Sequence, residues 1–209
     1  SPTIDNFDAV TPPRFIDYLE LNFDHPEHFQ KRFTRDIVPT QNQYTWEFSV
    51  ASNLEGMAEL HWDNMSLRNS GRELFLLDIA GQKLVNMKET GSYLFDPKES
   101  SNFKIYFGED LNITPERVQL GKAYPNPTTG FTKIAFSLPE TGGLNQNVSL
   151  EFMDAMGRTV GTITQGRFTP GYHETSLDAR ELTNGFYTYR LTVQNKNGRT
   201  TEVNKLIIK

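Results

Sequence analysis

The feature that most constrains this chain is its succession of short alternating segments separated by turn residues. Polar and apolar residues alternate over 44–50 and 131–138, a period of two that places neighbouring side chains on opposite faces of a strand. Similar segments recur at intervals of about ten residues, which is typical of a β-sandwich. No segment keeps an apolar period of 3.6 residues beyond two helical turns. The pattern therefore predicts an all-β fold.

The expected strands fall into two series. The first series covers 18–23, 32–38, 44–50, 57–62, 73–79, 82–87, 92–95 and 103–107. The second series covers 131–138, 147–154, 158–164, 173–178, 185–194 and 200–209. The sequence Asn197-Gly198 lies between the last two segments, and a glycine with positive φ is what a tight turn needs there. The final segment is therefore expected to be the second arm of a hairpin, which would hold the end of the sequence in a sheet.

Two tandem immunoglobulin-like sandwiches are the expected organisation. Residues 1–14 contain three prolines and no period, and we interpret them as a linker from something upstream. The first sandwich is expected over 15–108, a connector over 109–121 and the second sandwich over 122–209. The sequence begins at Ser1 and not at Met, which favours a piece of a longer chain with its cargo upstream.

Charge and composition exclude several function classes. Residues 15–108 carry nine Lys and Arg against fourteen Asp and Glu, whereas residues 122–209 carry ten against seven. This basic excess is too small and too scattered for nucleic acid, and no aromatic and basic stacking motif accompanies it. No apolar run approaches the roughly 18–20 residues of a membrane-spanning helix. The absence of Cys excludes disulfides and thiolate metal sites.

A weak internal repeat supports two domains of similar build. The segments ELFLLDIAGQKLV (73–85) and SLEFMDAMGRTVG (149–161) share an Asp followed after two residues by a Gly. In this interpretation the Asp accepts backbone N–H groups and the Gly takes the positive-φ position of a tight hairpin. An ordinary β-hairpin would show the same pattern.

Residues 122–209 resemble a known family in the order and spacing of four motifs. These motifs are Pro125-Asn126-Pro127, the D-x-x-G-R of Asp154–Arg158, the N-G-x-Y of Asn184–Tyr187 and the K-x-x-x-K of Lys205–Lys209. Together they resemble the C-terminal sorting domain of type IX secretion cargo. The resemblance implies a seven-stranded immunoglobulin-like sandwich related to the one in flagellar hook-capping proteins. Residues 15–108 look, less specifically, like β-sandwich modules that precede this sorting domain.

The resemblance also implies a function and a location. Such domains are carried by proteins of Bacteroidota that cross the outer membrane through the type IX translocon and are then released or attached at the cell surface. The family implies recognition by the translocon or its shuttle, followed by cleavage in the preceding linker by a sortase-like peptidase. Residues implied in recognition are Pro125, Asn126, Pro127, Gly185, Tyr187, Lys205, Leu206, Ile207, Ile208 and Lys209. The implied cleavage region contains Glu109, Asp110, Leu111, Asn112, Gly121 and Lys122. For the prolines, Gly185, Tyr187 and the two lysines, a purely structural role remains open.

Residues that carry chemistry are sparse, so no enzyme, cofactor or metal is expected. His25 and His28 sit near Asp24 and Glu27 in a Pro-containing loop, and a metal there would need further ligands from elsewhere. No nucleophile elbow and no glycine-rich phosphate loop are present. The expected mechanism is recognition and not catalysis.

One aromatic cluster leaves a binding module as the alternative function. Tyr44, Trp46 and Phe48 are two residues apart in turn and share one face of a strand. If these rings are exposed, they would form a platform for carbohydrate binding or adhesion. If they are covered, they belong to the core. Core packing is the favoured interpretation, and exposure of Trp46 separates the two.

Overall fold

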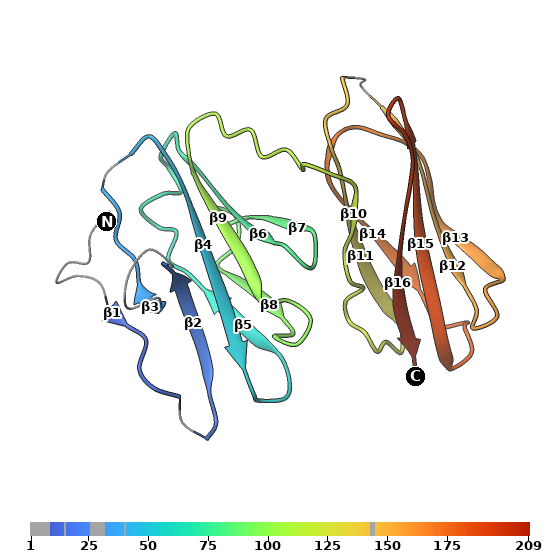
Figure 1. The fold of residues 1–209 in the computed structure, drawn as a ribbon, viewed down its shortest axis with the longest axis horizontal. Coiled ribbons are helices and arrows are strands. Elements are labelled where there is room, and N and C mark those ends of the chain that lie inside the picture. The colour runs from blue at the N-terminus through green and yellow to red at the C-terminus, as the bar shows by residue number, and fades with distance from the viewer. Residues whose placement is uncertain (1–8, 15, 26–31, 40, 143–144) are drawn as a thin grey trace. The chain divides into compact units, whose positions relative to one another are not determined.

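The computed structural model describes residues 9–14, 16–25, 32–39, 41–142 and 145–209. Within these ranges every regular element is a strand, so no helix that could cross a membrane is found there. The chain divides into two compact units (Figure 1): the first consists of residues 1–80 and 84–112, and the second of residues 81–83 and 113–209. We call them the first and second domains. The predicted all-β fold is confirmed.

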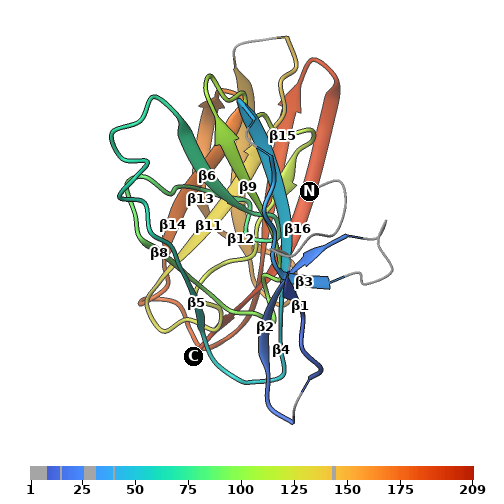
Figure 2. The same cartoon turned by 90° about the vertical axis from the view of Figure 1, so that its left-hand side faces the viewer.

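A seven-stranded antiparallel sheet dominates the first domain, in the order β1-β3-β2-β4-β9-β6-β7, and β5 pairs with β8 in a separate small sheet. Figure 2 shows β2 and β4 running side by side. The strand β2 pairs with β3, with Phe23 opposite Phe33. The strands are β1 (Ala9–Val10), β2 (Leu19–Asp24), β3 (Arg32–Arg35), β4 (Gln43–Ser52), β5 (Ala58–His61), β6 (Glu73–Asp78), β7 (Lys83–Asn86), β8 (Ser92–Phe95) and β9 (Asn102–Gly108).

The core of the first domain lies between these two sheets. Phe48 on β4 stacks on Phe103 on β9 with ring centroids 5.2 Å apart, and Phe95 on β8 meets Phe103 edge-on at 4.9 Å. Asp78 is buried beside this cluster, where its Oδ2 accepts hydrogen bonds from Ser100 Oγ (2.7 Å) and Tyr93 Oη (2.9 Å). These hydroxyl groups offset the cost of burying the carboxylate.

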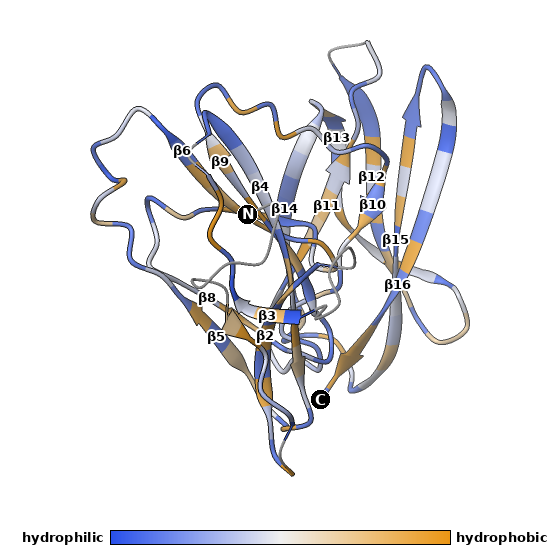
Figure 3. Ribbon diagram, turned by 60° about the vertical axis from the view of Figure 1, so that its left-hand side comes forward, coloured by the Kyte–Doolittle hydropathy of each residue, from blue (hydrophilic) through white to orange (hydrophobic). Residues whose placement is uncertain are grey.

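Two antiparallel sheets make up the second domain, in the orders β10-β11-β14 and β13-β12-β15-β16. Apolar residues alternate with polar ones along β12 and β15 (Figure 3), and the inward ones are buried, completely so at Leu150, Tyr189 and Leu191. The strands are β10 (Gln119–Leu120), β11 (Phe131–Leu138), β12 (Gln146–Met153), β13 (Thr159–Phe168), β14 (Gly171–Asp178), β15 (Gly185–Asn195) and β16 (Gly198–Ile208).

The last two strands form the predicted hairpin. Asn195 lies opposite Gly198, the side chain of Asn195 accepts the N–H of Asn197 (2.9 Å), and Gly198 has a φ of 119°. Glycine therefore supplies the backbone conformation that the turn requires. The hairpin pairing continues to Ile208, which lies opposite Gly185.

Three local features differ from the sequence-based expectations. Ala9–Val10 and Gln119–Leu120 form short strands within segments that were expected to be linkers. Leu120 is buried in the second core, which explains why this part of the connector is ordered against β11. In the turn after β6 the positive φ belongs to Gln82 (54°) and not to Gly81. The two proposed repeat turns are therefore not equivalent.

Candidate functional site

The open edge of β16 is closed by the motif Pro125-Asn126-Pro127. The Nδ2 group of Asn126 donates to the carbonyl of Lys205 (3.0 Å), and its Oδ1 accepts the N–H of Ile207 (2.9 Å). Cis peptide bonds precede both Pro125 and Pro127. Because β16 is the last strand of its sheet, these two backbone groups have no neighbouring strand to pair with. The amide of Asn126 takes the place of that strand.

Thr128 extends the same contact by two backbone hydrogen bonds. Its N–H donates to the carbonyl of Ile207 (2.9 Å), and its carbonyl accepts the N–H of Lys209 (2.9 Å). These bonds make a parallel bridge between Thr128 and Ile208. The first and last of the four sequence motifs are thus one structural element, which we call the edge clamp (residues 125–128 with 205–209).

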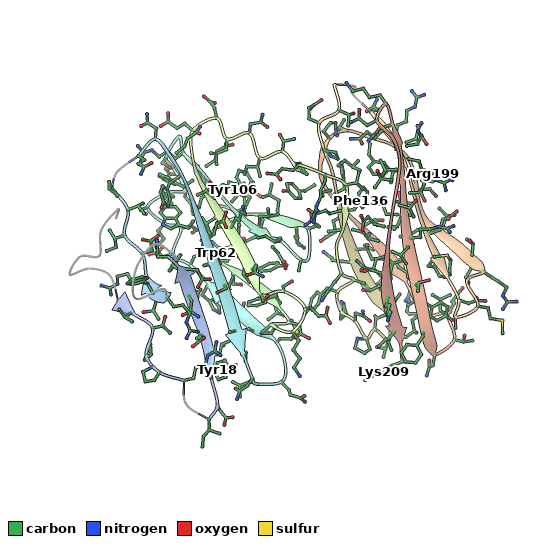
Figure 4. All side chains as sticks on the ribbon, in the orientation of Figure 1. Tyr18, Trp62, Tyr106, Phe136, Arg199 and Lys209 are labelled. Carbon is green, nitrogen blue, oxygen red and sulfur yellow. The ribbon has the colours of Figure 1, made fainter. Side chains whose placement is uncertain are left out.

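Side chains of the terminal strand alternate between core and surface. Leu206 and Ile208 point inward and are buried, whereas Lys205 and Lys209 are exposed and Ile207 is half-buried. Lys209 marks this end of the strand in Figure 4. Of these five residues implied in recognition, the two inward ones are therefore inaccessible and serve to hold the strand in place.

Phe186 is the functional candidate that sequence reasoning missed. It is 70% exposed and lies directly across from Ile207, so both side chains stand on the outward face of the β15–β16 hairpin. The sequence contained a signal for this position. Phe186 is the x of the N-G-x-Y motif, and neighbouring residues of a strand point to opposite faces, so an inward Tyr187 places Phe186 on the outward face. We call the outward face of this hairpin the outer strip: Phe186, Thr188, Arg190, Val203, Lys205 and Ile207.

The outer strip contains one exposed lysine and one arginine that is paired with a carboxylate. Lys205 is exposed, and Arg190 donates from Nη2 to Glu151 Oε2 at 2.8 Å. The Nε of Arg190 is buried without a hydrogen-bond partner within the described residues. Val203 lies opposite Arg190 and is 52% exposed. The strip therefore presents apolar side chains beside the exposed ammonium group of Lys205.

The N-G-x-Y motif shapes the inside of the domain. Tyr187 is buried, and its hydroxyl donates to the carbonyl of Thr183 (3.0 Å), which fixes the loop before β15. Two residues further on, the hydroxyl of Tyr189 accepts the N–H of Ala123 (2.7 Å) and donates to the carbonyl of Gly121 (2.9 Å). These buried bonds tie the segment that precedes the edge clamp to β15.

The D-x-x-G-R motif is a tight turn. Asp154 Oδ1 accepts the N–H groups of Met156 (2.9 Å) and Arg158 (3.0 Å), and Gly157 has a φ of 78°. The backbone hydrogen bond from Arg158, with help from its guanidinium at 2.7 Å, holds the pKa of the Asp154 carboxyl below its usual value. The predicted hairpin chemistry is confirmed at this turn.

The expected cleavage region divides into an exposed part and a buried part. Glu109, Asp110 and Asn112 are exposed and Leu111 is half-buried, next to the boundary between the two domains at residue 112. Gly121 is buried, and its N–H donates to the carbonyl of Ala135 (2.8 Å). Lys122 follows it and is exposed. Gly121 therefore lies in the body of the second domain and not in an open connector.

The aromatic face of β4 is neither wholly core nor wholly open. Phe48 is buried in the first core, so it is not available to a ligand. Tyr44 and Trp46 are half-buried and meet edge-on at 4.7 Å, and both line a surface pocket. The favoured core interpretation is right for Phe48 alone.

Among the residues that the structure describes, no group of three His, Cys, Asp or Glu side chains that could hold a metal ion is found. His25 Nε2 lies 3.6 Å from Asp36 Oδ1, and Glu27 and His28 are outside the described residues.

Residues 122–209 match the model of a family described as a secretion system C-terminal sorting domain. The second domain belongs to this family. It is the sorting domain of type IX secretion cargo, as the four motifs predicted. The protein that carries it is exported across the outer membrane to the cell surface or the medium. The sorting domain therefore interacts with the type IX machinery.

Solved structures show more distant likenesses. PorU from Porphyromonas gingivalis, in its dimeric latent form, is 20% identical with a TM-score of 0.38, over 78% of this chain and 18% of that one. A β-glucuronidase from Parabacteroides merdae is 14% identical with a TM-score of 0.31, over 79% and 29% of the two chains. A putative β-galactosidase from Bacteroides fragilis is 9% identical with a TM-score of 0.30, over 92% and 41%. This chain thus spans less than half the length of each. No curated protein sequence matches the chain.

Proposed function

We propose that the sorting domain is recognised through its outer strip. The outer-membrane shuttle or the translocon of the type IX machinery binds this strip. The exposed Phe186, together with the half-buried Ile207 directly across from it, carries this proposal. An antiparallel sheet that faces water on one side ordinarily presents polar residues there, and an exposed apolar group rimmed by polar residues marks an interaction site.

The charge of the strip adds to this argument. Lys205 is exposed beside the apolar pair, so an acidic partner surface with an apolar centre would complement it. The edge clamp supports recognition indirectly. By pairing the edge of β16 with Asn126 and Thr128, it fixes the positions of the outward side chains and prevents non-specific strand addition.

An export assay tests the outer strip. The protein is fused behind a periplasm-directed fluorescent protein in a host with a working type IX system, and surface and medium fluorescence are compared with periplasmic fluorescence. Phe186→Ser combined with Lys205→Ser is expected to retain the fusion in the periplasm. Phe131→Ser is the matched control, because Phe131 is a 57% exposed phenylalanine on the other sheet of the same domain. Export of the double variant at the control level would refute the proposal.

We further infer that a sortase-like peptidase cleaves the chain in the exposed connector of residues 109–112, next to the domain boundary. Exposed, irregular backbone is where proteolysis concentrates, and Asp110, with a φ of 52°, interrupts the extended chain after β9. The bonds around Gly121 are protected by the hydrogen bonds to Tyr189 and Ala135. Cleavage there would first require part of the domain to unfold.

Mass spectrometry of the exported product tests this inference. The expected new carboxy-terminus lies within residues 109–112. Replacing Asn112 by proline, which stiffens the connector without reaching either core, is expected to slow release of the sorting domain. A product that ends after residue 121, or an exported protein that keeps its sorting domain, would contradict the inference.

A further inference from the structure

One end of the large sheet in the first domain is left uncovered by its second layer. The small β5–β8 sheet packs over Phe48 and Phe103 through Phe95. Toward the beginning of β4, the register continues the same face through Trp46 and Tyr44, with Phe107 opposite Tyr44 on β9. These three rings lie beyond the two-stranded layer.

The three rings form the floor of a pocket of about 340 Å³, a size typical of small-ligand sites. Trp46 lies 6.3 Å from Phe107 between ring centroids, so the floor is continuous. The segment around Asp36, Pro39 and Gln41 provides one wall, and Arg72 provides another, with its guanidinium 5.3 Å from the centre of the Phe107 ring.

Two donor groups in this pocket make no side-chain hydrogen bond within the described residues. Within the described residues, the indole N–H of Trp46 makes no hydrogen bond, whereas that of Trp62 (labelled in Figure 4) donates to the carbonyls of Met87 and Thr90, both at 2.8 Å. The guanidinium of Arg72 meets Glu109 Oε1 at 3.7 Å, beyond hydrogen-bond length, and makes no side-chain hydrogen bond in the described part of the chain. Donors at the rim of an aromatic floor are thus available to a ligand.

From this combination we propose that the pocket binds one pyranose unit of a neutral saccharide, a function that goes beyond sorting. The C–H face of a sugar ring packs on the electron-rich face of an aromatic ring. The hydroxyl groups at the ring edge both donate and accept, which suits a rim of Arg72 and Gln41. The formal charges of Asp36 and Arg72 cancel, and Glu109 already lies beside the guanidinium, so an anionic sugar would meet more carboxylate than cation. A proline-rich peptide would also fit aromatic rings, but it carries fewer hydroxyl groups to pair with the polar rim than a sugar does.

The protein contains two tryptophans, which makes the test direct. In the full chain with Trp62→Phe, Trp46 is the sole tryptophan and reports on the pocket by its fluorescence. The probes are maltohexaose, cellohexaose, xylohexaose and mannohexaose at millimolar concentrations. A saturable change with at least one of them is expected. A flat response to all four, or saturation only with a proline-rich peptide or an oligogalacturonate, would overturn the proposal.

Side-chain replacement at the rim separates binding from folding. Arg72→Gln is expected to weaken saccharide binding by about tenfold, the loss typical of a charged hydrogen bond. Arg68→Gln is the matched control, because Arg68 is exposed outside the pocket. The variant Trp46→Ala, which keeps Trp62, is expected to show no measurable heat of saccharide binding by calorimetry. Circular dichroism verifies that this variant is folded. Binding that survives both pocket variants would refute the site.

Discussion

Replacing Asn126 by Ala removes the side chain that closes the edge of β16. The change deletes both hydrogen bonds of the amide, to the carbonyl of Lys205 and from the N–H of Ile207. It leaves Pro125, Pro127 and the backbone bonds of Thr128 in place. The perturbation is therefore confined to the edge clamp and leaves the core unchanged.

The expected loss follows from these two bonds. Each intramolecular hydrogen bond contributes about 0.5–1.5 kcal/mol net, which gives a range of about 1–3 kcal/mol. Asn126 is half-buried, so in the variant water can form hydrogen bonds with the carbonyl of Lys205 and the N–H of Ile207 in place of the amide. We therefore expect a loss of about 1–2 kcal/mol in the free energy of opening the edge, at the lower end of that range.

Amide hydrogen exchange measures this opening residue by residue, which avoids treating a two-domain chain as two-state. In Asn126→Ala, the Ile207 amide is expected to exchange about 5- to 30-fold faster, by the conversion of about 1.4 kcal/mol per factor of ten. Amides inside the β12–β15 pair should be unaffected. Asn147→Ala is the control, since Asn147 is exposed and its side chain bonds to no described residue. Unchanged exchange at Ile207 would refute the role given to Asn126.

Two further predictions concern buried and charged groups of the same domain. Tyr189→Phe removes a buried hydroxyl that bonds to Gly121 and Ala123, so we expect a loss of about 2–4 kcal/mol in unfolding free energy, measured by urea denaturation. Equal midpoints for the two proteins would contradict this. The Arg180 guanidinium lowers the pKa of Asp178 from 3.8 to about 2. The stabilisation from this pair is therefore full above about pH 4 and is lost as the pH falls through about 2. Arg180→Ala should return the carboxyl titration toward 3.8, observed by NMR, and no change would exclude the ion pair as the cause.

Local periodicity was enough to predict the longer strands, but not the two-residue strands β1 and β10. Alternation over residues 131–138 reappears as β11 with Ile134, Phe136 and Leu138 facing the core, because burial of one sheet face imposes a period of two. The turn at Gly198 was also predictable, because it depends on a single residue: glycine adopts a positive φ without steric cost. These features depend on residues close together in the chain.

The edge clamp was not predictable from pattern alone. Asn126 and Lys205 are 79 residues apart, and no local signal in the sequence pairs a side-chain amide with a particular backbone group. The same limit explains β4. Trp46 and Phe48 have identical periodicity, yet one lies at an open end and the other in the core, because the β5–β8 sheet is too small to cover both.

The central claim is that residues 113–209 carry the export signal, and their removal tests it most directly. A periplasm-directed fluorescent protein is fused to the full chain and, separately, to a chain that ends at Asn112, the last residue of the first domain. Both fusions are expressed in a host with a working type IX system and in the same host without its translocon. We predict that the full fusion reaches the surface or medium only when the translocon is present, and that the truncated fusion stays in the periplasm. Equal export of the two fusions, or export of the full fusion without the translocon, would contradict the account.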